Sequence, residues 1–394
     1  MTNHIFTPPS IGDYHFKGEI GYGAFSIVKL VQHSQSNNFF ACKVISKEKL
    51  SSIKRIERFE DEIRIQQQLH HPNVVQIYDL LKDEKNFYIM MEFCQGGELF
   101  QYIVDKGKLT EDEAKQILDQ ILEGIKYIHK MGVVHRDIKP ENILIDQNGN
   151  VKLSDFGLSK YVSLKSNLVK TPCGSPCYAS PECLSGLPYN GYISDMWSVG
   201  VLLYACVCGQ LPWTKRSQAE LFAQVKSGSY EIPSSLSLEC QDLIMRLMDT
   251  DTNTRITPEE ALKHEWFDSL LPQTRIQPKV NVPDLSLKKI DNFFTKYEYS
   301  QFKIDISLLN SLPNLTFQKV VKNIIPNPNF ASPVKVPESV NRMKLPTLSP
   351  KPRPRKDSGA NLKPLKALPR NPNSRKLSNP VNRPVRRSCV LPNI

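Results

Sequence analysis

Two short segments near the middle of the chain carry side chains that could move a phosphoryl group. The first runs from His135 to Asn142 with the sequence HRDIKPEN, and the second is the DFG run of Asp155–Gly157. Together they supply two carboxylates, an ammonium group and an amide at fixed offsets. Carboxylate and amide oxygens are ligands that Mg²⁺ prefers. The spacing predicts a site that holds a nucleotide phosphate with its metal ions and passes a phosphoryl group to a hydroxyl.

Each polar residue of this set has a predicted task. Asp137 can accept or orient the proton of the incoming hydroxyl, and Lys139 can neutralise charge on the moving phosphoryl group. Asn142 and Asp155 are the predicted metal ligands. His135 could act as a general base, but it follows two valines. An apolar run favours the interpretation that this histidine is a packed, hydrogen-bonded structural residue.

A glycine turn lies near the N-terminus, between two strand-like runs. Gly21 and Gly23 lack a Cβ and let the backbone approach phosphates closely. Ser26 stands where a strict phosphate-binding pattern has a third glycine. A glycine turn that only connects a hairpin looks the same, so this turn alone does not decide the function.

The next strand-like run, residues 39–45, carries a lysine among apolar neighbours. Alternation places Ala41 and Lys43 on one face of the strand, where a small residue would admit a flat base and the lysine could reach a phosphate. A solvated strand lysine is the simpler alternative. Because its surroundings are apolar, Lys43 needs a partner acid, and Glu62 of the helix predicted near residues 53–69 could provide it.

The pattern changes from strands to helices along the chain. A capping box of Thr110 and Glu113 precedes a helical apolar face that ends near Gly132, and a second box begins at Thr257. The order predicts an α+β fold with a small strand-rich lobe that has one main helix, a larger helical lobe, and a cleft between them.

These motifs occur together in the order typical of a eukaryotic protein kinase, which the chain resembles over residues 14–267. Within that family it is most similar to the calcium/calmodulin-dependent and AMP-activated group of serine/threonine kinases. Four segments carry this narrower resemblance: Gly96–Phe100, Asp137–Asn142, Cys173–Pro176 and Asp195–Gly200. The resemblance implies a bilobal kinase fold and ATP- and Mg²⁺-dependent transfer of the γ-phosphate to Ser/Thr hydroxyls of proteins.

The resemblance also implies roles for matching positions. Lys43, fixed by Glu62, would hold the α- and β-phosphates, and Asp137 would be the catalytic acid/base residue. The nucleotide would be enclosed by the glycine turn, the adenine pocket and the hinge, at Ile20, Gly21, Gly23, Val28, Ala41, Met91, Glu92, Cys94 and Leu144. Structural support would come from Ser175, Glu182, Asp195 and Arg255. Ser180 replaces the alanine of the usual Ala-Pro-Glu motif.

Regulation and substrate choice are implied in the same way. Thr171 aligns with the activating phosphosite of the family, and Arg136 is the arginine that would receive its phosphate. Pro172 departs from the pattern and leaves the activating kinase open, and an unmodified loop threonine is the alternative. Glu98 and Glu141 resemble the acids that bind arginine in a peptide, so protein substrates with basic residues before the Ser/Thr are expected.

Composition bounds the remaining expectations. The nine scattered cysteines, without a visible leader segment, indicate reduced thiols in an intracellular protein. We expect a cytoplasmic location, with the nucleus open as a second one. No apolar run reaches the ~18 residues of a membrane span. A monomer is expected, activated by an upstream kinase or by autophosphorylation.

The charge is concentrated at the C-terminal end. Residues 331–394 hold fifteen Lys/Arg, two Asp/Glu, twelve prolines and no aromatic residue. Their net charge is therefore +13. Because the whole chain has a net charge of +11, residues 1–330 have a net charge of −2. Such a segment is typical of disorder. We divide the chain into an N-terminal extension (1–13), a kinase domain (14–267), a C-terminal extension (268–325) that contains candidate docking segments, and a disordered basic tail (326–394).

The tail leaves several interpretations open. Runs at Arg375–Ser378 and Arg386–Ser388 resemble basophilic phosphosites, for autophosphorylation or as a pseudosubstrate. Residues 351–356 could bind acidic lipid, nucleic acid or an import receptor, and a merely solubilising tail is the simplest alternative. Two rival functions are a catalytically silent kinase-fold scaffold and a tether that acts through its tail, although Lys43, Asp137 and Asp155 are all present.

Overall fold

The computed structural model describes residues 5–23, 26–50, 52–162, 168–171, 173–215, 217–270 and 285–301. Side chains are described for these residues except Ile53 and 295–301. All of them belong to the first of the chain's two units, Met1–Ser311. The predicted tail and most of the predicted C-terminal extension lie outside the described residues.

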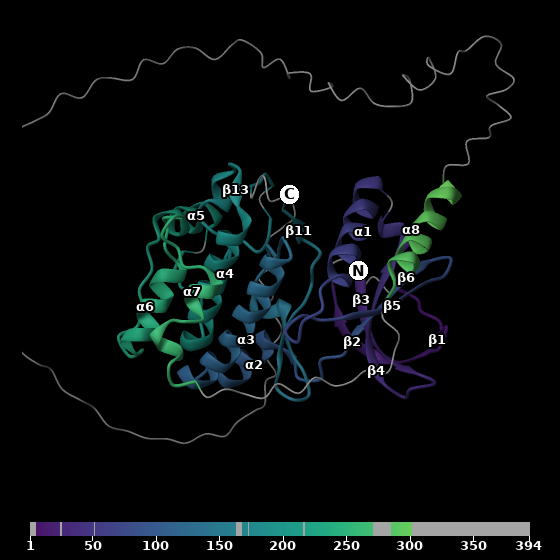
Figure 1. Ribbon diagram of the computed structural model, residues 1–394, viewed down its shortest axis with the longest axis horizontal. Coiled ribbons are helices and arrows are strands. Elements are labelled where there is room, and N and C mark those ends of the chain that lie inside the picture. Colours follow the sequence, from purple (N-terminus) through teal and green to yellow (C-terminus); the bar gives the residue numbers. More distant parts are fainter. Residues whose placement is uncertain are drawn as a thin grey trace, which may run out of the picture. The chain divides into compact units, whose positions relative to one another are not determined.

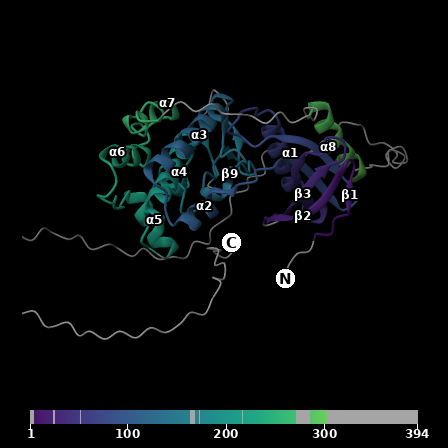
Figure 2. The same cartoon turned by 90° about the horizontal axis from the view of Figure 1, so that it is seen from below.

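A six-stranded antiparallel sheet forms the small lobe (Figures 1 and 2). Its spatial order is β1-β2-β3-β4-β6-β5. The strands are β1 (Ser10–Ile11), β2 (Tyr14–Tyr22), β3 (Ser26–His33), β4 (Phe39–Ser46), β5 (Ile77–Lys82) and β6 (Asn86–Glu92). The glycine turn lies between β2 and β3, and residues 24 and 25 are outside the described part.

The strand register decides which side chains share a face. Lys43 pairs with Val28 on one side and with Ile89 on the other, and Ala41 pairs with Met91. Residues directly opposite each other in a pair point to the same face of the sheet. One face therefore carries all five of these residues, as the alternation in residues 39–45 predicts.

Helix α1 (Ile53–Gln67) packs on that face, after the 3₁₀ turn η1 (Lys47–Leu50). Phe59 and Ile63 are buried against Ile45 and Ile89 of the sheet. Farther along α1, Ile65 belongs instead to the core of the large lobe. One helix thus contributes side chains to the cores of both lobes.

The large lobe is built mainly from helices. They are α2 (Leu99–Lys106), α3 (Glu111–Lys130), α4 (Gly191–Cys208), α5 (Gln218–Ser227), α6 (Leu238–Leu247) and α7 (Pro258–Ala261). The 3₁₀ turns are η2 (Pro140–Asn142), η3 (Cys183–Ser185) and η4 (Glu265–Phe267). Short strands complete it: β7 (Gly97–Glu98), β8 (Val133–Val134), β9 (Ile143–Ile145), β10 (Val151–Leu153), β11 (Lys160–Tyr161), β12 (Leu168–Val169) and β13 (Tyr189–Asn190).

Local signals in the sequence explain the main helices of this lobe. Both capping boxes form, at Thr110 for α3 and at Thr257 for α7. The helix α4 alone is long and apolar enough among the described residues to cross a membrane, but 78% of it is buried inside the fold. Its apolar length is therefore explained by its place in the core. The predicted α+β architecture of two lobes is confirmed.

The loop that follows α1 makes one set of hydrogen bonds between the two lobes. Val75 N–H donates to Leu153 O at 2.9 Å, and Leu153 N–H donates to Asn73 O at 2.8 Å. The Asn73 side chain also donates to Val151 O at 2.8 Å. These bonds attach the loop that follows α1 to strand β10 of the large lobe.

Segments outside residues 14–267 pack on the small lobe. At the N-terminal end, β1 pairs with β2, and Asn86 donates to Phe6 O at 3.0 Å. At the other end, helix α8 (Leu287–Gln301) lies beside β5 and β6 in Figure 1 and beside α1 in Figure 2. Four apolar residues of the predicted C-terminal extension join the buried cluster of α1 and the sheet: Leu285, Ile290, Phe293 and Phe294.

Candidate active site

The carboxylate of Asp137 is held by donors on both oxygens. Its Oδ1 accepts from the backbone N–H of Ser175 at 3.0 Å and from the Ser175 hydroxyl at 3.3 Å. Its Oδ2 accepts from Lys139 Nζ at 2.8 Å and from Asn142 Nδ2 at 2.9 Å. The Lys139 ammonium also donates to Ser175 Oγ at 3.0 Å. The structure thus gathers three predicted residues, Lys139, Asn142 and Ser175, around one acid that stays 10% exposed.

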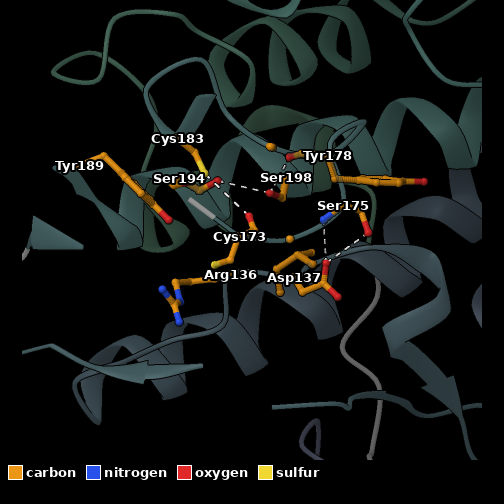
Figure 3. Close-up of a pocket in the computed structure, with 12 residues that line it drawn as sticks. Arg136, Asp137, Cys173, Ser175, Tyr178, Cys183, Tyr189, Ser194 and Ser198 are labelled. Atoms are coloured by element: carbon orange, nitrogen blue, oxygen red, sulfur yellow. Dashed lines mark hydrogen bonds between the residues drawn. The ribbon is translucent and has the colours of Figure 1, made fainter. Parts of the chain in front are cut away.

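Close approach of the segment 173–176 to this loop depends on a glycine. Gly174 has φ +91°, and a Cβ there would meet the carbonyl oxygen of Arg136 at 2.5 Å. Any other residue would push the segment away from the loop. Gly174 therefore lets Ser175 reach Asp137, as Figure 3 shows.

A second buried acid holds the backbone of the same loop. Asp195, on α4, accepts from the backbone N–H of His135 at 2.9 Å and of Arg136 at 2.8 Å. Its Oδ2 also lies 2.9 Å from His129 Nε2. Burial would raise the pKa of Asp195, but the hydrogen bond and charge of His129 outweigh it and the pKa is lowered. Asp195 is an ionised clamp next to Arg136, whose φ is +68°.

His135 takes part in this arrangement through its ring. The ring is fully buried, with Nε2 3.1 Å from Ser154 O and Nδ1 accepting from Asp137 N–H at 3.3 Å. It also packs on Phe156, with 4.9 Å between the ring centroids. Both ring nitrogens contact backbone groups, which fits the structural interpretation rather than a general base.

An ion pair across the lobes forms the other half of the site. Lys43 Nζ lies 2.7 Å from Glu62 Oε1 on α1 and 3.6 Å from Asp155 Oδ1 of the large lobe. Burial would lower the pKa of Lys43, but Glu62 and then Asp155 outweigh it, so the pKa is raised. The Lys43 charge lowers the pKa of Asp155. Both charges are present at neutral pH, and the Asp155 side chain is 53% exposed.

The DFG run packs closely against α1. A Cβ at Gly157 would meet Asp155 Oδ1 at 3.2 Å and Glu62 Oε2 at 3.3 Å. Phe156 is fully buried in the cluster that also holds Ile65 of α1. The backbone φ of Asp155 is +57°, which is unusual for a residue with a side chain. The run is therefore fixed between α1 and the large-lobe core, with its acid directed outward.

The predicted nucleotide-contacting residues come from both lobes. Val28, Ala41 and Met91 share the face of Lys43, and Gly21 pairs with Val28. Gly23 N–H donates to Ser26 O at 2.8 Å, which closes the described part of the turn. Of the others, Ile20 is 46% exposed, Cys94 is buried just after β6, and Leu144 lies half-buried on β9. Their contacts with adenine stay a prediction.

One buried ion pair at the hinge could not be predicted from the sequence. Lys152 Nζ on β10 lies 2.7 Å from Glu92 Oε1, and the two side chains are only 5% and 10% exposed. Lys152 also donates to Pro72 O at 2.9 Å. Position 152 reads as an ordinary strand lysine, and its partner is sixty residues away, so the single sequence holds no signal for this pair.

Cys173, two residues after Thr171, lines a small pocket with Arg136, Asp137, Cys183 and Tyr189 (Figure 3). Thr171 is exposed, and its carbonyl accepts from Tyr189 OH at 3.4 Å. Arg136 Nε donates to Leu158 O at 2.6 Å, whereas its buried Nη1 has no hydrogen-bond partner among the described residues. Burial raises the pKa of the Cys173 thiol. That thiol is therefore neutral at physiological pH.

Glu182 and Ser180, near the end of the segment that follows Thr171, attach it to the large lobe. The carboxylate of Glu182 binds Arg255 through two parallel contacts, 2.6 Å to Nη1 and 3.0 Å to Nη2. The Arg255 side chain is fully buried, donates to Ile193 O and Asp249 O, and lies 5.2 Å from the Trp197 ring. Ser180, at the atypical motif position, is buried and hydrogen-bonded to Ser194 at 2.8 Å. A small hydroxyl residue thus fits there.

The predicted acids for a peptide substrate lie on the surface. Glu98 and Glu141 are both exposed, at the start of α2 and in η2. Since α2 contacts η2, these two elements present their carboxylates from adjoining parts of the lobe.

The donor set suits the ligands that the resemblance implies. Asp155 offers an exposed ionised carboxylate, and buried Asn142 offers an amide oxygen next to the Asp137 network. Hard oxygen donors of this kind suit a divalent cation that also binds phosphates. Lys43 supplies a fixed positive charge toward the same phosphates. The residues present therefore fit a nucleotide with its metal.

Comparison with known proteins agrees with this geometry. The family described as protein kinase domain matches residues 14–267, more than half of the chain. The serine/threonine protein kinase OSK3 of Oryza sativa subsp. indica is 42% identical over 264 residues, which cover 67% of this chain and 52% of that protein. This chain thus spans about half the length of the rice kinase.

Two Arabidopsis thaliana proteins are also similar. The SNF1-related protein kinase catalytic subunit alpha KIN12 is 36% identical over 333 residues, 82% of this chain and 67% of that protein. CBL-interacting serine/threonine-protein kinase 3 is 40% identical over 259 residues, 65% of this chain and 59% of that protein. The expected family and fold are confirmed: this chain belongs to the protein kinase domain family, within the calcium/calmodulin-dependent and AMP-activated kinase-like group.

Proposed function

We propose that this protein is a serine/threonine protein kinase that transfers the γ-phosphate of ATP to protein hydroxyls with Mg²⁺. The proposal rests on one observation: Asp137 and Asp155 are each held by a set of side-chain contacts. Asp137 is held by Lys139, Asn142 and Ser175, and Asp155 lies beside the Lys43–Glu62 pair. Both sets are complete, whereas a catalytically silent scaffold would not need either.

The residues have distinct tasks in this reaction. Asp137 orients the substrate hydroxyl and accepts its proton as the oxygen attacks phosphorus. Lys139, 2.8 Å from Asp137, neutralises charge on the moving phosphoryl group. Lys43 orients the phosphates. Asn142 and Asp155 would hold Mg²⁺, which supplies charge neutralisation on the phosphate oxygens.

Phosphate transfer from labelled ATP to a basic peptide tests the proposal on the full chain. We expect Asp137→Asn to lose at least about a hundredfold in kcat, because general acid–base catalysis contributes roughly 10²–10⁴-fold. His135 neighbours it, but both of its ring nitrogens contact backbone groups, so His135→Asn serves as a matched control with a smaller loss. Equal rates for the wild type and Asp137→Asn would reject the catalytic role and favour the scaffold.

We further propose that phosphate on Thr171 switches the enzyme on. Support comes from the buried Arg136 Nη1, which has no partner among the described residues, and from the exposed Thr171 in the segment beside it. A phosphate adds about −1.5 to −2 charge and strong acceptors for arginine. The donor is an upstream kinase or a second molecule of this protein. Thr171→Ala should abolish activation on incubation with ATP and leave basal transfer, and activation that survives the substitution would contradict the switch.

Substrate preference and partners complete the proposal. The exposed carboxylates Glu98 and Glu141 favour peptides with arginine before the acceptor hydroxyl. A peptide library should show this preference, and Glu98→Gln with Glu141→Gln should reduce it. Indifference to upstream arginine would refute it. The basic tail would add attraction to acidic partners, and its deletion should then remove salt-sensitive binding.

We also propose a reducing intracellular location, the cytoplasm with the nucleus as a second compartment. The support is that the eight cysteines within the described residues are all free thiols. Imaging of a tagged full-length protein in its own cell tests this proposal.

A further inference from the structure

Helix α8 lies outside the matched residues 14–267, yet it packs on the helix that carries Glu62. The Phe294 ring lies 5.5 Å from the Phe59 ring of α1, and the Phe293 ring lies 5.2 Å from the Phe87 ring of β6. Ile290 is completely buried in the same cluster. These contacts give α8 an apolar anchor on both α1 and the sheet.

Polar contacts fix the same helix in register. Asp291 Oδ1 lies 2.8 Å from Arg64 Nη2, two residues after Glu62 on α1. The Leu285 carbonyl, just before α8, accepts from Gln67 Nε2 at 2.8 Å. On the sheet side, Lys289 pairs with Asp79 and Lys82 donates to Phe293 O. The α8 segment is therefore bound to α1 at both Arg64 and Gln67 and to β5 of the sheet.

The buried cluster that α8 completes adjoins the Lys43–Glu62 pair on both α1 and the sheet. On α1, Phe59 precedes Glu62 by three residues and Ile63 by four, so its side chain lies beside both on the helix surface. On the sheet, Ile89 pairs directly with Lys43. Phe59, Ile63 and Ile89 belong to one cluster with Phe293 and Phe294. The distance between Glu62 and Lys43 therefore depends on a cluster to which α8 contributes.

Helix α1 has weak local support at its beginning. Its N-cap residue Ser52 makes no side-chain cap hydrogen bond, and its first turn has no acidic residue. A helix of this length is marginal in water and depends on tertiary packing. Its C-terminal end is attached to the large lobe, whereas Phe59, in the half before Glu62, packs on the sheet and α8.

We propose that α8 is a positioning element for phosphoryl transfer: Phe293 and Phe294 hold α1 where Glu62 reaches Lys43. The inference rests on the proposed kinase function. It assigns to the C-terminal extension a part in catalysis without contact to the reacting atoms. Loss of these contacts lowers the fraction of molecules in which the Lys43–Glu62 pair is formed, and kcat falls with that fraction.

The first test replaces Phe293 and Phe294 by alanine in the full chain. We expect kcat to fall by roughly 2- to 30-fold, the range over which indirect couplings act, with the peptide KM within about twofold. The matched control is Asn292→Ala, since Asn292 lies on the exposed side of α8. Hydrogen exchange should accelerate in the α1 amides of the double variant only. Unchanged kcat with a lowered melting temperature would overturn the proposal in favour of a purely structural role.

A second test asks whether α8 acts through Glu62. In a Glu62→Ala background the pair is already broken, so adding the two alanines should lower kcat no further. Multiplying losses would show an independent effect and overturn the proposal.

A milder variant keeps the test valid if the double alanine chain fails to fold. Asp291→Arg places two arginines together and should lower kcat, whereas Asp291→Asn removes the ion pair with Arg64 without repulsion and should lower it less. Wild-type kcat in the Asp291→Arg variant would count against the proposal. If the wild type transfers no phosphate at all, the proposed function fails first, while the hydrogen-exchange result still reports whether α8 holds α1.

Discussion

The ion pair between buried Arg255 and partly buried Glu182 gives a quantitative prediction. Glu182→Gln keeps the shape of the side chain but removes its charge and turns one acceptor into a donor that faces the guanidinium. The Arg255 side chain is 0% exposed and Glu182 is 16% exposed. Removing one partner of a buried ion pair costs about 3–5 kcal/mol, because the other charge is left buried.

The neighbouring contacts place the expected cost at the low end of that range. Arg255 keeps the carbonyl oxygens of Ile193 and Asp249 at 2.9 and 2.7 Å as acceptors, and the Trp197 ring at 5.2 Å. We therefore expect the free energy of unfolding to fall by about 3 kcal/mol. For a domain of this size that corresponds to a melting temperature lower by roughly 6–12 °C.

Urea unfolding of the full chain measures this cost, with the Arg255→Met variant and the double variant completing a cycle. If the pair is the source, Glu182→Gln should cost little once Arg255 is gone, and the coupling energy should be about 2 kcal/mol. Glu182→Lys is unsuitable as a control because it adds repulsion, whereas the exposed Glu259→Gln changes charge without a buried partner. A loss below about 1 kcal/mol for Glu182→Gln would refute the reasoning.

Three further predictions concern Asp195 and Gly200, both on α4. Asp195→Asn sets an amide NH₂ against a buried backbone N–H, so the free energy of unfolding should fall by about 1–3 kcal/mol in urea, and equal midpoints would contradict the clamp. The pKa of Asp195 is lowered in the fold, so its contribution is present above the ordinary Asp value near 4 and is lost as pH falls through the lowered value. The difference between wild type and Asp195→Asn should therefore shrink on acidification, and a constant difference would exclude this linkage. At Gly200, an alanine Cβ would meet Met248 Cγ at 2.6 Å, so Gly200→Ala should cost about 1–3 kcal/mol in thermal unfolding, and an unchanged melting temperature would show that α4 and α6 separate freely.

Much of the fold follows from local chemistry in the sequence. The capping boxes at Thr110 and Thr257 begin helices at the expected positions, because each satisfies its own backbone donors within four residues. Alternation on β4 places Ala41 and Lys43 on one face, as the strand register shows. Such signals need no knowledge of distant segments.

The site was predictable where residue type limits the choice of partner. An isolated lysine among apolar residues requires an acid, and Glu62 is that acid at 2.7 Å. Asp137, Lys139 and Asn142 are close in sequence, so a short turn brings them together. Ser175 is 38 residues away from Asp137, and only the family resemblance indicated its place.

Contacts between distant segments explain what the sequence did not reveal. Lys152 alternates like any strand residue, and its burial depends on Glu92 and Pro72 from the small-lobe side. The spacing of Leu285, Ile290, Phe293 and Phe294 indicates an amphipathic helix but not the surface that it covers. That surface exists only after α1 and the sheet have assembled.

The bonds from residues 73 and 75 to β10 have a mechanical consequence. They attach the loop at the end of α1 to the large lobe, although α1 itself packs on the sheet of the small lobe. The same helix is packed on the sheet through Phe59 and Ile63. Rotation of one lobe against the other would therefore strain α1 between its two attachments, and the contact between Lys43 of the sheet and Glu62 of the helix lies between them.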